Sequence, residues 1–376
     1  MNKIFDEPLI GACIFGQSGG PTAVINASAY GVIRTALDCD AITKVYGAAY
    51  GIKGVLEDEL YDMGEEEDYE LKLLLNTPSS ELGSCRYKMA DPDVDDTDYK
   101  RVLEIFKKYD VRYFFYNGGN DSMDTCNKIS RYMEKVGYEC RVIGVPKTID
   151  NDLSCTDYTF GFETASNIAM EAIDRLQTTA KAHSRCIVVE CMGRHTGWIA
   201  LQAGLAANAH LVLIPEFPKS YDEIISVVRR RYLRGDRYTI IVVAEGFELL
   251  GGDEIDLGTD AFGNKLLIHK NLAKNLSDMI EDTMRNDPLL GSDAQYFECR
   301  PVVLGHVQRG GAPCAFDRVL GTRLGIKAGE LVVRRDYGKM VALNGNSIVG
   351  ADLETAVTVR KEVDREFYEA ASLYFK

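Results

Sequence analysis

A short polar segment carries the residues best suited to catalysis. The sequence PKTIDND supplies Lys147, Thr148, Asp150 and Asp152 directly after an apolar run. If the segment is extended, Asp150 and Asp152 point to the same side, because side chains two residues apart share a face. One carboxylate of such a pair can act as a general base while the other holds a metal or orients a reacting group. The pattern favours a catalytic site over the alternative of a plain polar turn.

The loop GQSGG, residues 16–20, has the composition of a phosphate-binding turn. Gly19 and Gly20 let the backbone approach a ligand closely, and the helix expected after them offers N–H groups to a phosphate. The loop lacks the lysine of a Walker motif and the glycine spacing of a Rossmann motif. A glycine turn that only joins a strand to a helix is the alternative.

A second glycine-rich loop, NGGNDS at residues 117–122, is more polar. Next to Gly119, the side chains of Asn120 and Asp121 offer oxygen ligands for a hard cation such as Mg²⁺. The structural alternative is a helix N-cap made by Asp121 or Ser122.

Arginines stand at the ends of further apolar runs. Arg185 precedes the run CIVVEC and Arg194 follows it, whereas Arg300 precedes a run that ends near His306 and Arg309. Guanidinium groups bind phosphate through two parallel hydrogen bonds. This distribution predicts a sugar-phosphate pocket.

These residues need a scaffold of short buried strands to position them. Apolar runs predict strands at Ile10–Phe15, Val111–Tyr116, Arg141–Val145, Cys186–Cys191, Leu211–Ile214, Ile240–Ala244 and Val302–Leu304. Strands that alternate with helices are typical of parallel sheets, in which ligands bind beyond the carboxyl ends of the strands. The predicted fold class is α/β, with two doubly wound, mostly parallel lobes and the active site in the cleft between them.

Two of the helices can be bounded from the sequence. Pro21 suits the first turn of a helix that runs to about Leu37, because its missing N–H needs no partner there. Within 164–182, Ile168, Ala172 and Leu176 recur at a spacing of four residues and predict the buried face of a second helix.

Composition excludes several classes of protein. The chain has 376 residues and a formal net charge of −14, which fits two lobes and disfavours nucleic-acid binding, since that normally needs a basic face. No apolar run approaches the roughly 20 residues of a membrane span, and the N-terminus lacks a signal-peptide pattern. We therefore expect a cytoplasmic enzyme without a membrane or nucleic-acid partner.

The cysteines and the acidic stretches have simple structural interpretations. Ten cysteines without a CxxC pair are interpreted as reduced, core-filling thiols, and no histidine pairs with another ligand at zinc-like spacing. Acidic residues are concentrated in segments 57–70 and 91–98, which we expect to be solvated surface.

Seven motifs occur in an order that matches a known family. They are GQSGGPTAVINAS, LGSCRYK, GGNDS, PKTIDND, VVECMGRHTGW, VVAEGF and VLGHVQRGG. Together they resemble the phosphofructokinase family, in its pyrophosphate-dependent type, over roughly residues 10–325. The resemblance implies a phosphoryl-donor-binding lobe of residues 1–160 plus about 308–350. It implies a fructose 6-phosphate-binding lobe of residues 161–307 plus about 351–376.

The resemblance also implies roles in phosphoryl transfer. Asp150 corresponds to the base that takes the proton from the 1-hydroxyl of the sugar, with support from Asp152, and Thr148 contacts the transferred group. The donor would be bound by Gly19, Gly20, Arg86, Gly119, Asp121, Ser122 and Lys147. Positioning and charge neutralisation of this kind are what phosphoryl transfer needs.

The implied sugar site draws on a second set of residues. It comprises Thr148, Arg185, Met192, Gly193, Arg194, Glu245, Arg300, His306 and Arg309. Arg185 and Arg300 match arginines that family members supply from a neighbouring subunit. The resemblance therefore implies a homo-oligomer, at least a dimer.

Two positions bear on the identity of the donor. Asp121 stands where ATP-using relatives usually have glycine and pyrophosphate-using relatives have aspartate. At ~4 Å and an effective dielectric near 20, a carboxylate there would repel the α-phosphate of ATP by about 4 kcal/mol, roughly a thousandfold in affinity. Lys147, where ATP users usually have glycine, adds a point positive charge. Pyrophosphate is the expected donor, with ATP as the alternative.

Two departures from the family pattern concern the metal and regulation. Asn120 stands where the family commonly has an aspartate that binds Mg²⁺, so the chain is expected to hold Mg²⁺ less strongly, with help from Asp121 or from pyrophosphate itself. Tyr30 stands where allosteric bacterial relatives have an effector-binding arginine. No regulation by ADP or phosphoenolpyruvate is expected.

The leading hypothesis is reversible transfer from pyrophosphate to fructose 6-phosphate in glycolysis or gluconeogenesis. The alternatives are an ATP-dependent 6-phosphofructokinase and a non-catalytic sugar-phosphate sensor. A sensor would have no need of the intact Asp150 and Asp152 pair. A related substrate such as sedoheptulose 7-phosphate is also compatible with the sequence.

Overall fold

The chain forms two compact units. The structure, a computed structural model, describes residues 9–251, 271–333 and 337–375. Unit 1 comprises Met1–Glu163 and Ala312–Arg360, and unit 2 comprises Thr164–Gly311 and Lys361–Lys376. The segment 351–360, which the expected boundaries assign to the second lobe, belongs to unit 1, where its helix packs on one helix and two strands of the unit. Residues 308–311, expected in the first lobe, belong to unit 2.

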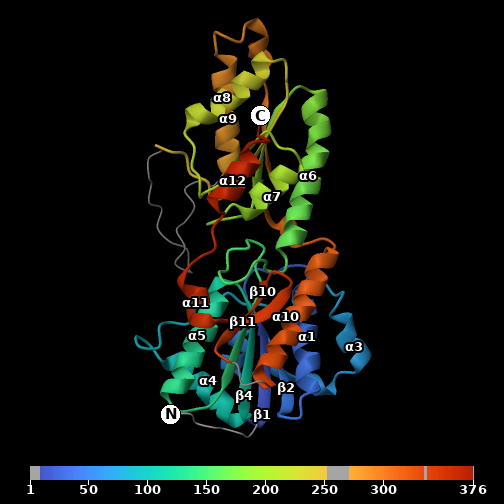
Figure 1. Cartoon of the computed structure of the whole chain (residues 1–376), viewed down its shortest axis with the longest axis vertical. Helices are drawn as coiled ribbons and strands as arrows, with labels where there is room; N and C mark the ends of the chain where they lie inside the picture. The colour runs from blue at the N-terminus through green and yellow to red at the C-terminus, as the bar shows by residue number, and fades with distance from the viewer. Residues whose placement is uncertain (1–8, 252–270, 334–336, 376) are drawn as a thin grey trace. The chain divides into compact units, whose positions relative to one another are not determined.

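Unit 1 is built on a seven-stranded sheet with the strand order β11-β10-β5-β4-β1-β2-β3 (Figure 1). Its strands are β1 (Gly11–Gln17), β2 (Ile42–Ala48), β3 (Leu60–Asp62), β4 (Val111–Gly118), β5 (Arg141–Pro146), β10 (Lys339–Asn344) and β11 (Ser347–Asp352). The central strands are parallel, and only β3 and β11 at the two edges pair antiparallel.

Helices cover both faces of this sheet because each central strand is apolar on both sides. On β4, Tyr113 and Phe115 face one helical layer, while Phe114 and Tyr116 face the other. The first layer contains α1 (Ile25–Leu37), α3 (Asp68–Leu73) and α10 (Ala315–Val333). The second contains α2 (Ile52–Glu57), α4 (Thr97–Lys108), α5 (Asn120–Lys135) and α11 (Leu353–Thr358).

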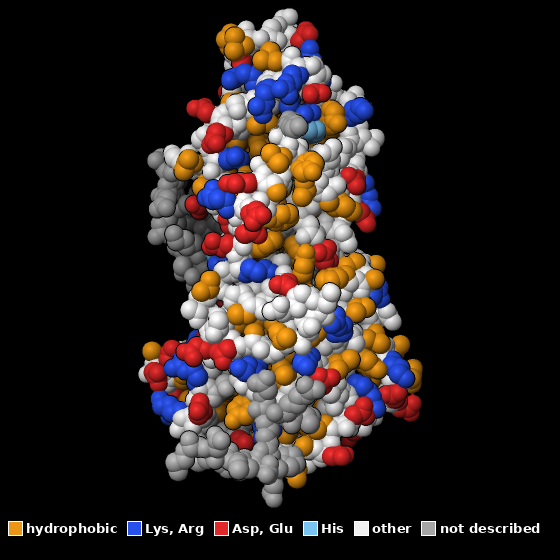
Figure 2. Space-filling view, in the orientation of Figure 1, with side chains coloured by type: hydrophobic (Ala, Val, Ile, Leu, Met, Phe, Trp, Pro, Cys, Tyr) orange, Lys and Arg blue, Asp and Glu red, His pale blue; other side chains and the backbone are white. Residues whose placement is uncertain are grey.

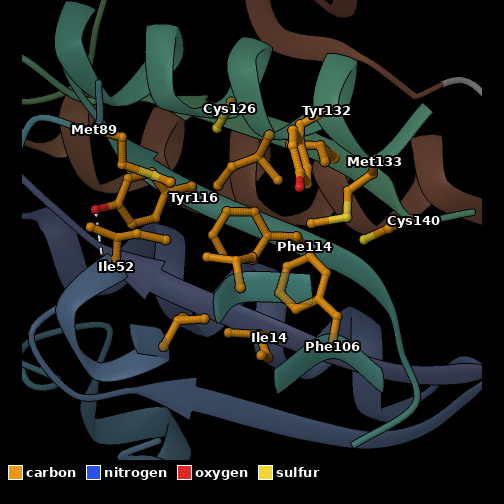
Figure 3. Close-up of a cluster of buried hydrophobic side chains, with 14 of the residues drawn as sticks. Ile14, Ile52, Met89, Phe106, Phe114, Tyr116, Cys126, Tyr132, Met133 and Cys140 are labelled. Carbon is orange, nitrogen blue, oxygen red and sulfur yellow. Dashed lines mark hydrogen bonds between the residues drawn. The ribbon is translucent and has the colours of Figure 1, made fainter. Parts of the chain in front are cut away.

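The second layer shows how tightly the aromatic strand residues are packed. In Figure 3, Phe114 and Tyr116 point toward the helix that carries Cys126 and Met133. The Tyr116 hydroxyl also accepts a hydrogen bond of 3.2 Å from the Ile52 backbone N–H, which satisfies the polar end of a buried tyrosine. Burial of each large side chain contributes about 1.5–3 kcal/mol, so this core stabilises the sheet whose loops carry the candidate site.

Unit 2 has a four-stranded, all-parallel sheet with the order β7-β8-β6-β9. The strands are β6 (Cys186–Cys191), β7 (Leu211–Leu213), β8 (Thr239–Ala244) and β9 (Cys299–Val303). Its helices are α6 (Phe162–Ala182), α7 (Trp198–Ala206), α8 (Tyr221–Leu233), α9 (Leu272–Arg285) and α12 (Arg365–Ser372). The expected α/β class with mostly parallel sheets in two lobes is confirmed.

Two expectations about helices were wrong in detail. The first helix begins at Ile25 rather than at Pro21, because the Thr22 hydroxyl accepts a hydrogen bond from the Val24 N–H and holds residues 21–24 in a turn. In α6 the fully buried stripe is Ala165, Ala169 and Ile173, with Ala180 further on. Ile168, Ala172 and Leu176 lie one position away and are only partly buried, so the buried face of the helix is displaced by one residue from the predicted one.

The surface agrees with the expected solvation of the charged segments. Most residues of 57–70 and 91–98 are exposed, and several form ion pairs, such as Asp93 with Lys135 at 2.7 Å. Charges of both signs are interspersed on the face shown in Figure 2. All ten cysteines are free, and seven of them are buried. Among the described residues no helix is both long enough and apolar enough to cross a membrane.

Candidate active site

The three polar loops of unit 1 follow strands that lie side by side. The last residues of β1 pair with β4 at Gln17 and Asn117, and the last residues of β4 pair with β5 at Gly118 and Pro146. Because these strands are parallel, their carboxyl ends meet at one edge of the sheet. The structure therefore brings together the loops that begin at Ser18, Gly119 and Lys147.

Lys147 ties the first loop to the third. Its side chain is 2% exposed, and its Nζ donates a 2.6 Å hydrogen bond to the carbonyl of Gly20. Gly19 has a φ of +79°, and a Cβ added there would lie 3.1 Å from the Lys147 Nζ. Any residue with a side chain would therefore be strained at position 19 and would crowd the ammonium group.

The second loop presents its polar residues at the start of α5. Gly119 is the N-cap, and no side chain caps the helix, so neither Asp121 nor Ser122 has the structural role proposed as the alternative. Ser122 is buried, whereas Asp121 is exposed in the first turn, where the helix dipole favours a negative charge. Asp121 is thus available to contact a ligand at this helix end.

The third loop is a turn and not an extended segment. Asn151 has a φ of +51°, and its side-chain oxygen accepts a 3.0 Å hydrogen bond from the Thr159 N–H. The Thr148 hydroxyl accepts a 3.1 Å bond from the Asp150 N–H. The extended conformation that would place both side chains on one face is therefore not adopted, yet the carboxylates of Asp150 and Asp152 still interact electrostatically.

Asp152 is a strongly perturbed carboxyl group in this loop. Burial, followed by the negative charge of Asp150, raises the pKa of Asp152 to about 7. The opposing influences are Arg360, whose Nε lies 3.3 Å from Asp152 Oδ2, and Asn120, whose Nδ2 donates a 2.8 Å hydrogen bond to the same oxygen. The other oxygen, Oδ1, is buried without a hydrogen-bond partner.

The segment that carries Arg86 lies against the glycine loop. The Gly19 N–H donates a 3.0 Å hydrogen bond to the Cys85 carbonyl, and the Ser84 hydroxyl donates a 2.6 Å bond to the Gly19 carbonyl. Arg86 itself is exposed. The fully buried Gln17 side chain accepts from Ser80 at 2.7 Å and so fastens this segment further, a support that the sequence analysis missed.

In unit 2, the predicted sugar-binding residues gather at the carboxyl ends of β6, β8 and β9. The Glu245 N–H bonds to the Cys191 carbonyl at 2.9 Å, and the Met192 N–H bonds to the Gln308 side chain at 3.2 Å. Gly193 has a φ of +135°, and an added Cβ would lie 2.4 Å from the Thr196 carbonyl. These contacts group the segments that carry Met192, Gly193, Arg194, Glu245, His306 and Arg309.

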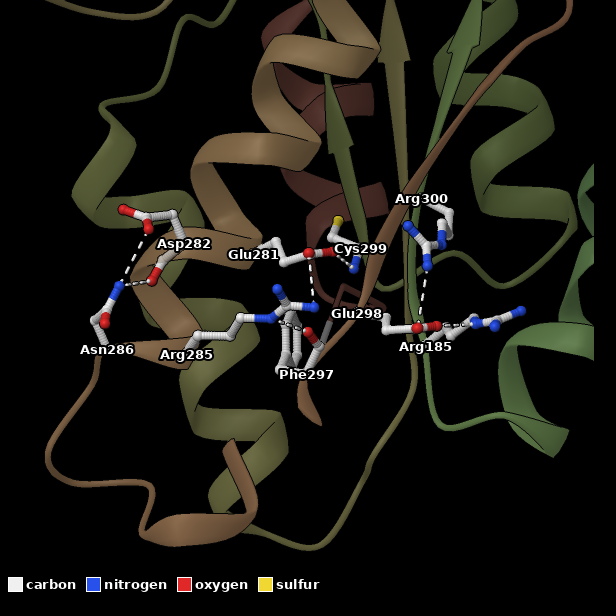
Figure 4. A network of polar contacts seen from close by, with 9 residues as sticks. All are labelled: Arg185, Glu281, Asp282, Arg285, Asn286, Phe297, Glu298, Cys299 and Arg300. Atoms are coloured by element: carbon white, nitrogen blue, oxygen red, sulfur yellow. Dashed lines mark hydrogen bonds and ion pairs between the residues drawn. The ribbon is translucent and has the colours of Figure 1, made fainter. Parts of the chain in front are cut away.

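Arg185 and Arg300 lie elsewhere in this unit. Both bind Glu298, at 2.5 and 3.0 Å, as Figure 4 shows. Arg185 immediately precedes β6, and Arg300 pairs with Ile187 near the amino end of that strand. Because all four arginines stand at the ends of apolar runs, the sequence predicted one pocket that holds them with Arg194 and Arg309. The structure separates the two pairs, since Arg194 and Arg309 follow the carboxyl ends of β6 and β9.

The described residues contain no group of three or more histidine, cysteine or acidic side chains that could hold a metal ion. The oxygen-rich set beside α5 nevertheless fits Mg²⁺, since Mg²⁺ usually takes one or two carboxylates and completes its shell with water and substrate phosphate. The unpartnered Oδ1 of Asp152 and the exposed carboxylate of Asp121 are such oxygens.

The comparisons with known proteins agree on one family. A model described as Phosphofructokinase matches residues 12–332. The chain is 40% identical over 361 residues to the pyrophosphate–fructose 6-phosphate 1-phosphotransferase of Amycolatopsis methanolica, covering 95% of this chain and 97% of the relative. It is 37% identical over 362 residues to the ATP-dependent 6-phosphofructokinase of Mycobacterium leprae, with coverages of 95% and 97%.

A solved structure also resembles the whole chain. The pyrophosphate-dependent phosphofructokinase from Marinobacter aquaeolei aligns with a TM-score of 0.79 and 31% identity, covering 95% of this chain and 86% of that protein.

Proposed function

The chain belongs to the phosphofructokinase family, and we propose that it transfers a phosphoryl group from pyrophosphate to the 1-hydroxyl of fructose 6-phosphate. The products are fructose 1,6-bisphosphate and phosphate, and the reaction runs in both directions. The observation that carries the proposal is the pair of carboxylates, Asp150 and the buried Asp152, beside a glycine loop held by Lys147.

In the proposed reaction, Asp150 acts as the general base. Two close carboxylates cannot both ionise easily. Here burial and the charge of Asp150 disfavour the ionised form of Asp152. Asp150 is therefore the carboxylate that takes the proton from the 1-hydroxyl. The sugar oxygen then forms a bond to one phosphorus of pyrophosphate, the bridging P–O bond breaks, and phosphate leaves.

The donor is proposed to bind unit 1. The backbone of Gly19 and Gly20, the N-terminus of α5 from Gly119 to Ser122, and Arg86 supply N–H groups and positive charge for its phosphates. Lys147 holds the glycine loop in shape through its bond to the Gly20 carbonyl. Mg²⁺, held by Asp121 and Asp152 beside Asn120, would supply charge neutralisation of the phosphates.

The sugar phosphate is proposed to bind unit 2, with Thr148 of unit 1 contacting the reacting end. Met192, Gly193 and Arg194 hold the sugar, Glu245 binds its hydroxyl groups, and His306 and Arg309 bind the 6-phosphate. Arg185 and Arg300 are proposed to serve the site of a second copy of the chain. Their position away from this cluster, at the amino end of β6, supports that role.

The choice of pyrophosphate over ATP rests on Asp121. This carboxylate is exposed at the N-terminus of α5, where the α-phosphate of a nucleotide would meet a like charge. Solvent lowers the repulsion from about 4 kcal/mol toward about 1 kcal/mol, which still disfavours ATP by roughly five- to a thousandfold. ATP-dependent transfer is the second candidate, because a relative named for that activity is 37% identical to this chain.

Replacement of the base tests the proposal. Asp150→Ser is expected to lower kcat by at least about a hundredfold, since general bases typically contribute that much. Binding of fructose 6-phosphate, measured by calorimetry, should be retained because the sugar-binding residues are unchanged. Asp222→Ser, at an exposed aspartate in the first turn of α8, is the control. Unchanged turnover of Asp150→Ser would reject the proposed mechanism.

A further inference from the structure

Asp152 has a partner from the far end of the unit 1 sequence. Arg360 is the last residue of the segment 312–360, and its Nε lies 3.3 Å from Asp152 Oδ2. The backbone of Arg360 forms an antiparallel bridge with Leu153, and the Ser154 hydroxyl donates a 3.1 Å hydrogen bond to the Ala356 carbonyl. The C-terminal segment is thus attached to the catalytic loop by backbone contacts as well as by the ion pair.

The two donors to Asp152 fix the orientation of its carboxylate. Asn120 and Arg360 both contact Oδ2, at 2.8 and 3.3 Å, whereas Oδ1 has no hydrogen-bond partner. A partial rotation of the carboxylate group would move Oδ2 away from both donors and break both contacts. One oxygen is therefore committed to the protein and the other is left for the reaction.

The two donors differ in charge. Asn120 offers only a neutral amide, whereas Arg360 brings a full positive charge to a carboxylate whose side chain is 8% exposed. A buried carboxylate next to a second one is unfavourable unless it is compensated. Arg360 supplies that compensation from outside the segments that carry the family motifs.

We propose that Arg360 is a positioning residue for phosphoryl transfer, which holds Asp152 in the orientation that the reaction needs without touching the substrates. The inference rests on the catalytic roles proposed for Asp150 and Asp152. It assigns a part in catalysis to the C-terminal segment of unit 1. The Arg360 side chain is 40% exposed, so its contribution to overall stability is expected to be small.

Substitution of Arg360 tests this role through the division between kcat and KM. Arg360→Ala should lower kcat by about 10- to 100-fold, the usual range for residues that orient a catalytic group, with KM for both substrates changed by less than about twofold. Arg360→Lys, or millimolar guanidinium added to Arg360→Ala, should restore much of kcat. Arg175→Ala removes an exposed arginine paired with Glu171 at 3.2 Å and is the matched control.

A double-mutant cycle separates this inference from the proposed function. In an Asp152→Asn background, the additional Arg360→Ala substitution should change kcat by less than about twofold, because the partner through which it acts is gone. An equal loss of kcat in both backgrounds, or an unchanged kcat in Arg360→Ala, would overturn the inference. Failure of the proposed function would appear separately, as unchanged turnover in Asp150→Ser.

Discussion

Among single residues, Asp150 and Asp152 have unequal environments, which supports the different roles proposed for them. Asp152 is buried, and burial together with the charge of Asp150 raises its pKa to about 7. Arg360 and Asn120 oppose this rise by contacting Oδ2. The pair therefore resembles other catalytic carboxylate pairs, in which environment assigns one group to proton transfer and the other to support.

The sequence predicted the two aspartates but not the residues that set their properties. Asp150 and Asp152 were identified from their spacing and from a motif, both of which are local. Arg360 meets Asp152 only because the chain returns to unit 1 after β11, and no local pattern contains that contact. Nδ2 of Asn120 donates a hydrogen bond to Asp152, a contact that only the fold reveals, and the prediction that Asn120 binds a metal through its oxygen stays a prediction.

The preference for one phosphoryl donor is predicted to depend on the side chain of Asp121. Asp121→Gly should raise the ratio of kcat/KM for ATP to that for pyrophosphate by at least about fivefold, because a like charge is removed from the position of the α-phosphate. Asp124→Gly, an aspartate on the next turn of α5, is the control for a glycine placed in this helix. A ratio that stays constant in Asp121→Gly would show that this carboxylate does not select the donor.

At the scale of elements, the site depends on three adjacent parallel strands. β1, β4 and β5 are neighbours in the sheet, so the loops after them converge at one edge. Their apolar runs are short and bounded by glycine or proline, which is why the strands at Val111 and Arg141 were predicted within two residues of their observed ends. Strands buried on both faces give the clearest pattern.

The edge strands β3 and β11 were not predicted, because they are short or exposed. β3 has only three residues, and β11 is an antiparallel edge strand in which no residue is fully buried. A half-exposed strand of this kind lacks a continuous apolar run. The start of α1 was also placed wrongly, because the hydrogen bond from Val24 to the Thr22 hydroxyl competes with the helix.

One partly buried histidine, His210, is expected to make the stability of unit 2 depend on pH. Nδ1 of His210 accepts a 2.9 Å hydrogen bond from the N–H of Ile240, near the start of β8. Burial, and next the positive charge of Arg231, lower the pKa of His210 to about 4, from 6.5. The unfolded chain therefore binds a proton that the folded chain does not, and stability should fall as the pH drops from about 6.5 toward 4.

Urea unfolding can isolate this effect. The single tryptophan, Trp198, lies in α7 of unit 2, so its fluorescence reports on the same unit. Between pH 7.5 and 5, the wild type should lose roughly 1 kcal/mol more of its unfolding free energy than His210→Asn, whose side-chain oxygen can accept the same bond without titrating. Equal pH dependence in the two proteins would show that His210 does not cause it.

Across the whole molecule, the two units carry different sets of the proposed site residues. Unit 1 carries the carboxylate pair and the glycine loops, and unit 2 carries the arginine and histidine residues proposed for the sugar phosphate. Arg185 and Arg300 share Glu298 and stand apart from that second group. Their placement is the structural argument for a site completed by another copy of the chain.

Co-expression of two inactive variants tests whether sites are shared. Asp150→Ser and Arg300→Ala should each be strongly impaired, whereas purified mixed dimers should recover roughly half of wild-type activity, because each mixed dimer keeps one intact site of two. Differently tagged chains allow the mixed species to be purified and assayed. Mixed oligomers without activity above the two parent variants would indicate that Arg300 acts within its own chain or not at all.

Initial rates of the wild-type protein show whether pyrophosphate is the phosphoryl donor. Formation of fructose 1,6-bisphosphate should be measured with Mg²⁺ and fructose 6-phosphate, with pyrophosphate and ATP as donors in parallel. The repulsion expected at Asp121 predicts that kcat/KM is at least about fivefold higher with pyrophosphate. A higher kcat/KM with ATP would contradict the proposed donor and leave the carboxylate pair serving an ATP-dependent reaction.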